Sequence, residues 1–426
     1  MPSSRPNHIS HLCQRVLDIQ PKSILDVGCG FGSKGVLFRE YTDIWNLRYD
    51  KEKWETRIDG VEIFEKYICS LQKEIYDKIY IGDILTIDIK SYDLIYLGDV
   101  LEHFTTEDGK KLLEKLILKS KHLIIATPLK VFEQSEILGN IYETHKSQWT
   151  PEDFVGASVK IIDNVIFAEY EKKVYYCEAM KTFGEKIKMP RYNSQTDIYS
   201  PVFFQGLYFE EDYQTFLNHK GIKQVFWNGS DVLRMLYNPN WIEIIRTFKT
   251  EHTCHNKQLQ DELASVGIRA RIKPIFFSEI EKYPLSYVYS ETPQVYMTCN
   301  DGREEEYGVN QVLEIAEETP DIKFHIFGIN GQNTDNVIYH GWVEEDEMIN
   351  LIKNFQSCLR RNKHDGFSQT VMKSILMGQY PIVYNFINGV WQAQTKEELK
   401  EKLKLLKEQK EPNFKLREKY LEILNS

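Results

Sequence analysis

The sequence has no apolar stretch close to the roughly 18 residues that a membrane-spanning helix needs. Its first residues, MPSSRPNHIS, contain no apolar core of the kind found in secretion signals, so we expect no secretion signal there. The seven cysteines are scattered and form no CxxC pair, a pattern that favours neither a zinc knuckle nor a disulfide framework. Together these absences indicate a cytoplasmic protein without an integral membrane segment.

Positive charge is also in short supply. Lys and Arg number 53 against 63 Asp and Glu, which gives a formal net charge of −10. This balance does not favour a surface for duplex nucleic acid, and we expect no nucleic-acid partner. The chain has 426 residues, 42% of them hydrophobic. That length suggests two or three domains.

Residues 24–130 alternate between apolar strands and helices. The predicted strands are 24–30, 57–64, 78–84, 92–100 and 122–128, with an amphipathic helix over 107–118 whose apolar face contains Leu112, Leu113, Leu116 and Ile117. Continuous apolar strands separated by helices indicate a parallel, doubly wound sheet. The fold class is therefore α/β.

Residues 160–200 differ, because 165–180 alternate as antiparallel strands do and 185–200 are polar. We place a domain boundary near 185–195. The second half resumes the βα pattern, with strands expected at 200–206, 223–229, 269–277, 294–299, 323–329, 336–343, 357–363 and 380–385. Helices are expected at 257–266, 304–318, 345–355 and 395–409, and 280–293, with two prolines, reads as a hinge.

A glycine turn, DVGCGFG, follows the first strand and precedes a helix. Glycines there allow a tight turn and a close approach by a ligand, but such a turn alone is weak evidence. Acidic residues end the next two strands as well: Glu62 is placed to accept from both ribose hydroxyls of a nucleotide-type cofactor, and Asp83 from its adenine amino group. Asp26, at the end of the first strand, can accept from an amino group of the same cofactor.

ILDVGCGFGSKG resembles the first motif of class I S-adenosylmethionine-dependent methyltransferases, and VEIF, GDI and GDVLEHF resemble the later ones. NIYETHKSQWTPEDF, residues 140–154, is similar to a recurring segment of the small-molecule and sugar members. The resemblance covers roughly residues 8–180 and implies a Rossmann-like domain that binds S-adenosylmethionine. The cofactor residues it implies are Asp26, Gly28, Gly30, Gly32, Glu62, Asp83, Ile84 and Asp99. No NPPY-type motif for amino methylation of DNA is present.

Methyl transfer to a hydroxyl requires an in-line approach and removal of a proton. His103 follows the fourth strand, where the methyl group should lie, and His145 lies in the capping segment. Either can be the base, and a packing role remains open for both. Asp99 and Glu102 can orient the base or hold a divalent ion, but their spacing establishes no metal site.

Residues 360–385 form a second segment with a distinctive pattern. It predicts the end of a strand, a glycine loop, a helix and a further strand, in that order. The expected helix start near Ser368 offers free backbone N–H groups to an anion. Three basic residues precede it and can hold the diphosphate of a nucleotide sugar, although a capped helix beside surface basic residues is the alternative. The candidate residues are Arg303, Arg360, Arg361, Lys363, Asp365, Gly366, Phe367, Ser368, Gln369, Thr370 and Lys373.

This run resembles the donor site of retaining GT-B glycosyltransferases related to family 4. The matching residues are Asp365-Gly366-Phe367 and Gly378-x-x-Pro381. The resemblance implies an acceptor-side lobe over 195–285 and a nucleotide-sugar lobe over 290–426, after a methyltransferase domain over 1–190. The chain departs from the family pattern at Lys373, where a second acidic residue is usual, and at Tyr307, where a lysine is usual.

The sequence thus predicts a bifunctional enzyme that methylates a hydroxyl oxygen of a sugar or glycan and transfers sugar from a nucleotide sugar during assembly of a surface glycan or glycoconjugate. Three alternatives stay open. The second half can be a degenerate module that only binds glycan, the enzyme can tailor a small molecule, or both sites can be inactive in a non-enzymatic scaffold.

Overall fold

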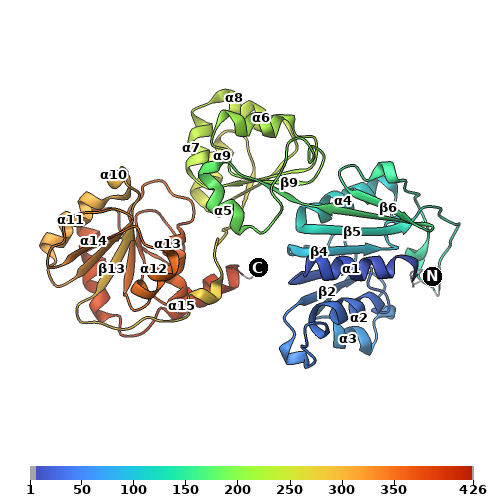
Figure 1. Cartoon of the computed structure of the whole chain (residues 1–426), viewed down its shortest axis with the longest axis horizontal. Helices are drawn as coiled ribbons and strands as arrows, with labels where there is room; N and C mark the ends of the chain where they lie inside the picture. The colour runs from blue at the N-terminus through green and yellow to red at the C-terminus, as the bar shows by residue number, and fades with distance from the viewer. Residues whose placement is uncertain (1–5, 138, 425–426) are drawn as a thin grey trace.

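The computed structural model describes residues 6–137 and 139–424 and divides them into three α/β units, each built on its own sheet. The units follow one another along the chain, and Figure 1 shows the middle unit above and between the two outer ones. None of the helices in the described part of the chain combines the length and the apolar character needed to cross a bilayer.

The N-terminal unit is a seven-stranded sheet in the order β3-β2-β1-β4-β5-β7-β6. Strands β1 to β5 pair in parallel, and β7 runs antiparallel to both β5 and β6. The bounds are α1 Ile9–Ile19, β1 Ser23–Val27, α2 Ser33–Arg39, β2 Arg57–Glu62, α3 Ser70–Ile75, β3 Lys78–Ile81, β4 Tyr92–Gly98, α4 Thr106–Lys119, β5 Ser120–Pro128, β6 Ser158–Ile162 and β7 Val165–Glu171. All five strands predicted for this half are confirmed.

Helix α4 packs against the sheet through its apolar face. Its four predicted apolar residues are all buried against the sheet. Thr105 caps its start by accepting from the Asp108 backbone N–H, and Gly109 lets Trp149 pack closely, because a Cβ there would stand 2.4 Å from the indole ring. The segment 140–154 is thereby held over the carboxyl ends of the strands.

The middle unit is a five-stranded parallel sheet in the order β12-β11-β10-β9-β8. Its elements are β8 Lys173–Tyr175, α5 Lys181–Lys186, β9 Val202–Gln205, α6 Glu210–Asn218, β10 Lys223–Trp227, α7 Ser230–Leu236, α8 Pro239–Thr247, β11 Glu251–Cys254, α9 Lys257–Ser265 and β12 Ala270–Ile272. The sequence predicted antiparallel pairing beyond residue 165, and that holds for β6 and β7 only. Strand β8 instead pairs in parallel with β9, so the second sheet begins at Lys173, ahead of the boundary expected at 185–195.

The C-terminal unit is a six-stranded parallel sheet in the order β15-β14-β13-β16-β17-β18. Its elements are β13 Gln294–Thr298, α10 Glu304–Tyr307, α11 Val309–Glu318, β14 Lys323–Phe327, β15 Val337–Gly341, α12 Glu345–Ile352, β16 Ser357–Arg360, α13 Gln369–Leu376, β17 Ile382–Val383, β18 Trp391–Gln392, α14 Lys396–Leu405 and α15 Phe414–Leu424. The helix expected over 304–318 is broken at Gly308, which has φ +71° and lies where a Cβ would be 2.6 Å from Arg361.

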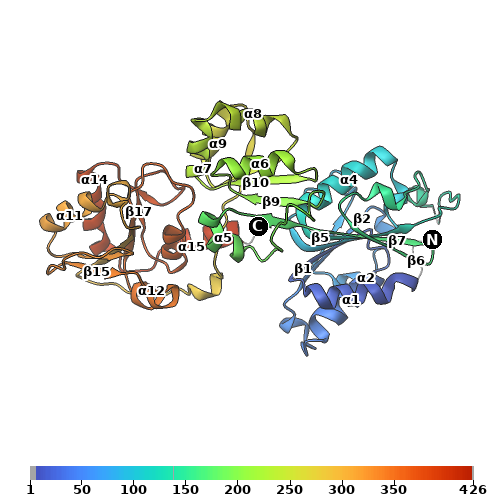
Figure 2. The ribbon, with the colours of Figure 1, turned by 45° about the horizontal axis from the view of Figure 1, so that its top comes forward.

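The predicted hinge, 280–293, is attached to the C-terminal unit. The backbone N–H groups of Ser286 and Tyr287 both donate to the Met377 carbonyl, at 3.2 and 3.1 Å. Helix α15 packs Leu416 and Tyr420 into the same core, and Figure 2 shows the C-terminus near the centre of the molecule, between the outer units. The Asn256 side chain of the middle unit donates to the Asp365 and Gly366 carbonyls at 2.9 and 2.7 Å, which ties these two units together.

Candidate functional site

A pocket of about 290 Å³ lies at the carboxyl ends of β1, β2 and β4. The glycine turn after β1 forms one wall. Gly28 has φ +73°, and a Cβ at this position would lie 2.3 Å from a methyl group of Val100. Only glycine therefore allows the turn to approach the loop after β4 this closely.

The first carboxylate of the pocket is Asp26, at 1% exposure. The Tyr76 hydroxyl donates to its Oδ2 at 2.6 Å. Burial raises the pKa of Asp26 to about 6, although the Tyr76 hydrogen bond opposes this effect. The side chain is thus fixed in place with its second oxygen available to a donor in the pocket.

Glu62 and Asp83 stand beyond the next two strands, as the sequence predicted. Glu62 accepts from the Gly30 N–H at 2.9 Å and from the Phe64 N–H at 2.8 Å, so its carboxylate is oriented by backbone from both loops. Burial raises the pKa of Glu62 above its ordinary value. Asp83 accepts from the Leu85 N–H at 2.9 Å, and Ile84 is buried against the same pocket.

Asp99 is the fourth acidic residue of the pocket, and its backbone is strained. It adopts φ +51°, a left-handed conformation that is uncommon outside glycine and is often retained at functional sites. Its Oδ2 atom is buried and has no hydrogen-bond partner among the described residues. Because Asp99 lines the pocket, this oxygen is a candidate acceptor for a donor that enters there.

The two candidate histidines meet at the rim of this pocket. The His103 and His145 rings are 5.0 Å apart between centroids. Nδ1 of His103 lies 3.3 Å from the Thr144 carbonyl, and Nδ1 of His145 lies 2.6 Å from the Phe132 carbonyl. We assign the proton of each ring to Nδ1, which leaves both Nε2 atoms as acceptors.

Glu102 completes a cluster with these rings. One ligand atom from each of Glu102, His103 and His145 lies within 4.8 Å of the other two. A carboxylate and two imidazoles, each imidazole oriented by a carbonyl, is a donor set suited to a divalent transition metal. Burial, followed by the negative charge of Asp99, raises the pKa of Glu102 to about 8, whereas burial lowers the pKa of His103.

The second candidate region lies where the strand order of the C-terminal sheet reverses, between β13 and β16. Ligands commonly bind beyond the carboxyl ends of strands at such a point. Arg303 and Arg360 both lie over the Tyr307 ring, at 5.4 and 4.7 Å from its centroid. Arg360 also forms a two-pronged ion pair with Asp365, at 2.6 and 3.1 Å.

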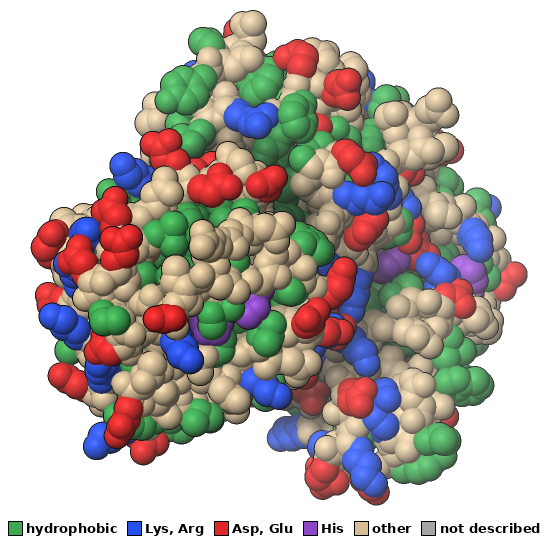
Figure 3. Space-filling view, turned by 60° about the vertical axis from the view of Figure 1, so that its left-hand side comes forward, with side chains coloured by type: hydrophobic (Ala, Val, Ile, Leu, Met, Phe, Trp, Pro, Cys, Tyr) green, Lys and Arg blue, Asp and Glu red, His purple; other side chains and the backbone are tan. Residues whose placement is uncertain are grey.

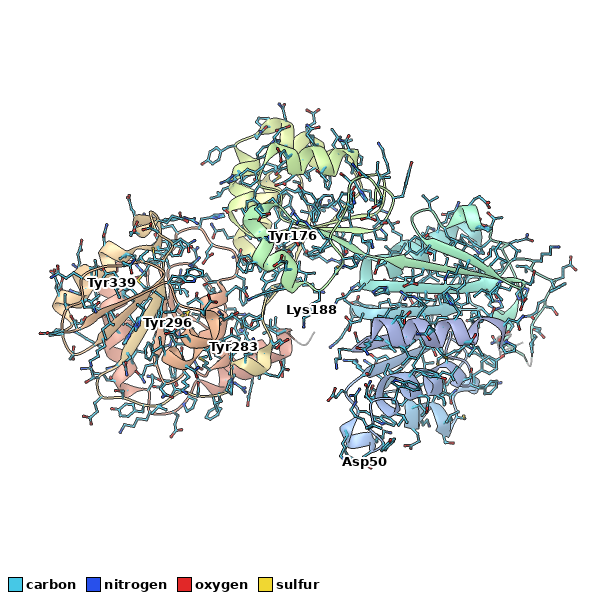
Figure 4. All side chains as sticks on the ribbon, viewed as in Figure 1. Asp50, Tyr176, Lys188, Tyr283, Tyr296 and Tyr339 are labelled. Carbon is cyan, nitrogen blue, oxygen red and sulfur yellow. The ribbon has the colours of Figure 1, made fainter. Side chains whose placement is uncertain are left out.

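Other predicted donor-site residues have partners within the protein. Arg361 is buried and donates to Gln311 and to the Ala393 carbonyl. Lys373 donates to Glu345 at 2.6 Å, and Tyr283, labelled at the inner margin of this unit in Figure 4, donates to the same carboxylate. Ser368 caps α13 as expected. Lys363, Gly366, Phe367, Gln369 and Thr370 lie on the loop and first turn around it.

Sequence reasoning missed several pocket residues. Tyr76, which positions Asp26, and Tyr96, which lies under the pocket and bonds to His8 at 2.9 Å, come from a helix end and a strand interior. Tyr142, Glu143 and Lys146 cover the pocket from segment 140–154. The family resemblance of segment 140–154 was the one sequence signal for the residues that cover the pocket. Tyr76 and Tyr96 gave no signal, because single tyrosines within apolar runs resemble core residues.

No family model and no curated protein matches this chain. Among solved structures, it is similar over its N-terminal part to the methyltransferase domain of bacterial CtHen1, with 17% identity, 38% of this chain and 97% of that chain covered, and a TM-score of 0.27. It is also similar to magnesium protoporphyrin IX methyltransferase from Synechocystis PCC 6803 with bound SAH, with 15% identity, 38% and 80% coverage, and a TM-score of 0.28. A putative O-methyltransferase from Nostoc punctiforme PCC 73102 matches with 18% identity, 38% and 55% coverage, and a TM-score of 0.28.

The raised pKa of Asp26 predicts a pH-dependent stability. Folding raises this pKa from 3.8 to about 6, so the protonated form stabilises the fold. That stability is present below pH ~4 and is lost as the pH rises through ~6, by roughly 3 kcal/mol in all. We expect Asp26→Asn and wild type to be equally stable near pH 4, and the variant to be more stable at pH 7. Urea unfolding of both ligand-free proteins between pH 4 and pH 7 measures this difference in the free energy of unfolding. A difference that stays constant across the pH range would contradict the prediction.

Proposed function

We propose that the N-terminal unit is an S-adenosylmethionine-dependent methyltransferase that acts on a hydroxyl group of a sugar or glycan. The observation that carries this proposal is the pocket at the carboxyl ends of β1, β2 and β4, where carboxylates from three successive strand ends face a glycine turn. The sulfonium cofactor carries a positive charge and donates through its amino group and ribose hydroxyls. Of the six acidic side chains that line the pocket, Asp26, Glu62, Asp83 and Asp99 supply the matching acceptors.

Each acidic residue has a distinct part in holding the cofactor. Glu62 is placed for the ribose hydroxyls, Asp83 with Ile84 for the adenine, and Asp26 for the amino group. Asp99, with its unpartnered buried oxygen, is placed for the cofactor's remaining donors. The cofactor supplies an electrophilic methyl group and its own leaving group, so the protein's task is to position an acceptor and take up its proton.

His103 is the residue we propose for that proton. It lines the pocket, and its Nδ1 is engaged with a carbonyl, so Nε2 is the free acceptor. Glu102, its neighbour in the turn Leu101–His103, and His145, from the segment 140–154, lie beside it. The same three side chains are close enough to hold a divalent cation, which would bind the acceptor oxygen and lower its pKa. Removing divalent cations with a chelator distinguishes His103 acting as the base from the cluster acting as a cation site.

The first test concerns the cofactor. S-adenosylmethionine should bind the full chain with micromolar affinity, about −8 kcal/mol. Glu62→Ala should weaken binding by roughly 1–3 kcal/mol, because the ribose hydroxyls lose a charged acceptor. Glu65→Ala, an exposed acidic residue three positions on, is the matched control and should bind like wild type. Calorimetry measures all three; binding of NADH instead of S-adenosylmethionine would redirect the unit to hydride transfer.

The second test concerns the cluster at the pocket rim. His103→Ala should lower methyl-transfer turnover about 10²-fold or more, with the Kd of the cofactor little changed. If His103 is the base, treating wild type with EDTA leaves turnover intact. If the cluster holds a cation, EDTA abolishes turnover and a divalent metal restores it. Wild-type turnover in the His103→Ala variant would exclude both roles and move the assignment to His145.

We further propose sugar transfer from a nucleotide sugar as the function of the middle and C-terminal units. Two features support it: each unit is built on a parallel sheet, and Arg303, Arg360 and the start of α13 lie near the switch point of the C-terminal sheet. Arg360 and Lys373 already have carboxylate partners, so a bound diphosphate has to compete with Asp365 and Glu345. The runner-up is therefore a glycan-binding unit without transfer activity.

Nucleotide binding separates these two alternatives. UDP or GDP should raise the Tm of the full chain, and Arg303→Ala should reduce that shift, because the half-exposed Arg303 guanidinium, paired with Glu306, lies over Tyr307 beside Arg360. Arg269→Ala, an exposed arginine of the middle unit, is the control. If no nucleotide among UDP, GDP, ADP, CMP and dTDP gives a Tm shift that Arg303→Ala reduces, the unit is not a working transferase. The glycan-binding alternative then replaces it.

A further inference from the structure

A second large cavity, of about 820 Å³, lies between the N-terminal and middle units. It includes the first residues of β1, β4 and β5, whereas the cofactor pocket lies at the opposite ends of these strands. Tyr92 starts β4 in this cavity and Gly98 ends it in the cofactor pocket. Six residue steps along a strand separate the two sites by roughly 20 Å, so the cavity is not part of the cofactor pocket.

The walls of the cavity are strongly cationic. Eight basic side chains line it against three acidic ones: Lys78, Lys90, Lys119, Lys121, Lys172, Lys186, Arg271 and Lys273 against Asp88, Asp93 and Glu251. In a chain with a net charge of −10, such an excess is local. Figure 3 shows Lys and Arg side chains, with Asp and Glu side chains among them, along the furrow between the outer masses of the molecule.

The three acidic residues do not neutralise this charge. Asp93 pairs with Lys121 at 2.8 Å, Asp88 with Lys119 at 3.9 Å, and Glu251 with Arg271. Lys186 pairs with Glu345 of the C-terminal unit. Each pairing involves a different cation, and none of them includes Lys172 or Lys273.

Lys172 and Lys273 donate to uncharged groups instead. Lys172 is 6% exposed, and its Nζ donates to the Leu118 carbonyl at 3.0 Å and to Gln224 at 2.6 Å. Lys273 donates to the Ser91 hydroxyl at 3.2 Å. No carboxylate pairs with either of them in the described part of the chain. Burial, followed by the neighbouring charge of Lys273, lowers the pKa of Lys172 to about 7.

We propose that this cavity binds a small molecule bearing a diphosphate, with the phosphate oxygens between Lys172 and Lys273. Phosphates supply the negative charge and the several acceptors that clustered ammonium groups require. Tyr80, Phe203 and Phe276 line the same cavity and offer an apolar wall to the rest of the ligand. The volume is within the range of small-molecule sites.

The ligand would bridge two units. Lys119 belongs to the N-terminal unit and Lys273 to the middle unit, and Lys172 stands between their sheets. A bound anion replaces repulsion between these groups by attraction to a shared partner. Binding therefore stiffens the junction of the two units and protects their backbone from exchange.

Inorganic pyrophosphate is the probe, tested on the full chain by calorimetry and hydrogen exchange. We expect millimolar or tighter binding that is lost in 1 M NaCl because salt screens it. We also expect slower exchange at 88–93 and 270–277. Lys172→Met with Lys273→Ala should weaken binding at least tenfold. Lys22→Ala, an exposed lysine beside β1, is the matched control and should not.

The outcomes separate this site from the others. Arg303→Ala should leave pyrophosphate binding intact, and loss of binding in that variant would place the anion at the C-terminal unit and overturn the proposal. No binding to wild type, or equal binding to the double variant, also overturns it. S-adenosylmethionine binding by the double variant shows that it is folded.

Discussion

Parallel strand pairing is the constraint on which the arrangement of this protein depends. Nearly every neighbouring pair in the three sheets runs parallel, so each sheet gathers its carboxyl ends at one edge and its amino ends at the other. The cofactor pocket and the Arg303–Tyr307–Arg360 stack both lie at carboxyl edges, where loops and helix starts converge. The cationic cavity lies at an amino edge, where the first two units meet.

The sequence predicted what depends on local pattern. Continuous apolar runs predicted strands β1 to β5. The positions of Asp26, Glu62 and Asp83 at the ends of three of these strands predicted that the three residues lie at one edge of the sheet. It did not predict what depends on partners distant in the chain. Strand β8 alternates like an antiparallel strand but pairs in parallel with β9, and β11, with His252 and Cys254 buried, was hidden in a polar stretch. Tyr76 and Tyr96 became site residues only through tertiary packing.

The two candidate sites differ in how their charges are balanced. At the first, the Oδ2 atom of Asp99 has no hydrogen-bond partner among the described residues, so a donor that reached it would displace no existing contact. At the second, Arg360 and Lys373 are each neutralised by a carboxylate. A ligand there gains only the difference between its own contacts and those it displaces. The two sites therefore differ in how much an added ligand gains from their charged residues.

Strand β8 begins two residues after β7 ends, with only Lys172 between the two sheets. It is also the edge strand of the middle sheet, paired with β9 through Lys173, Val174 and Tyr175. A chain that began after this strand would leave the backbone groups of β9 without that partner, beside the apolar Val202 and Phe204. Such an open edge is a template for intermolecular pairing. Strand β8, which follows directly on the last strand of the N-terminal unit, thus protects the middle sheet from aggregation.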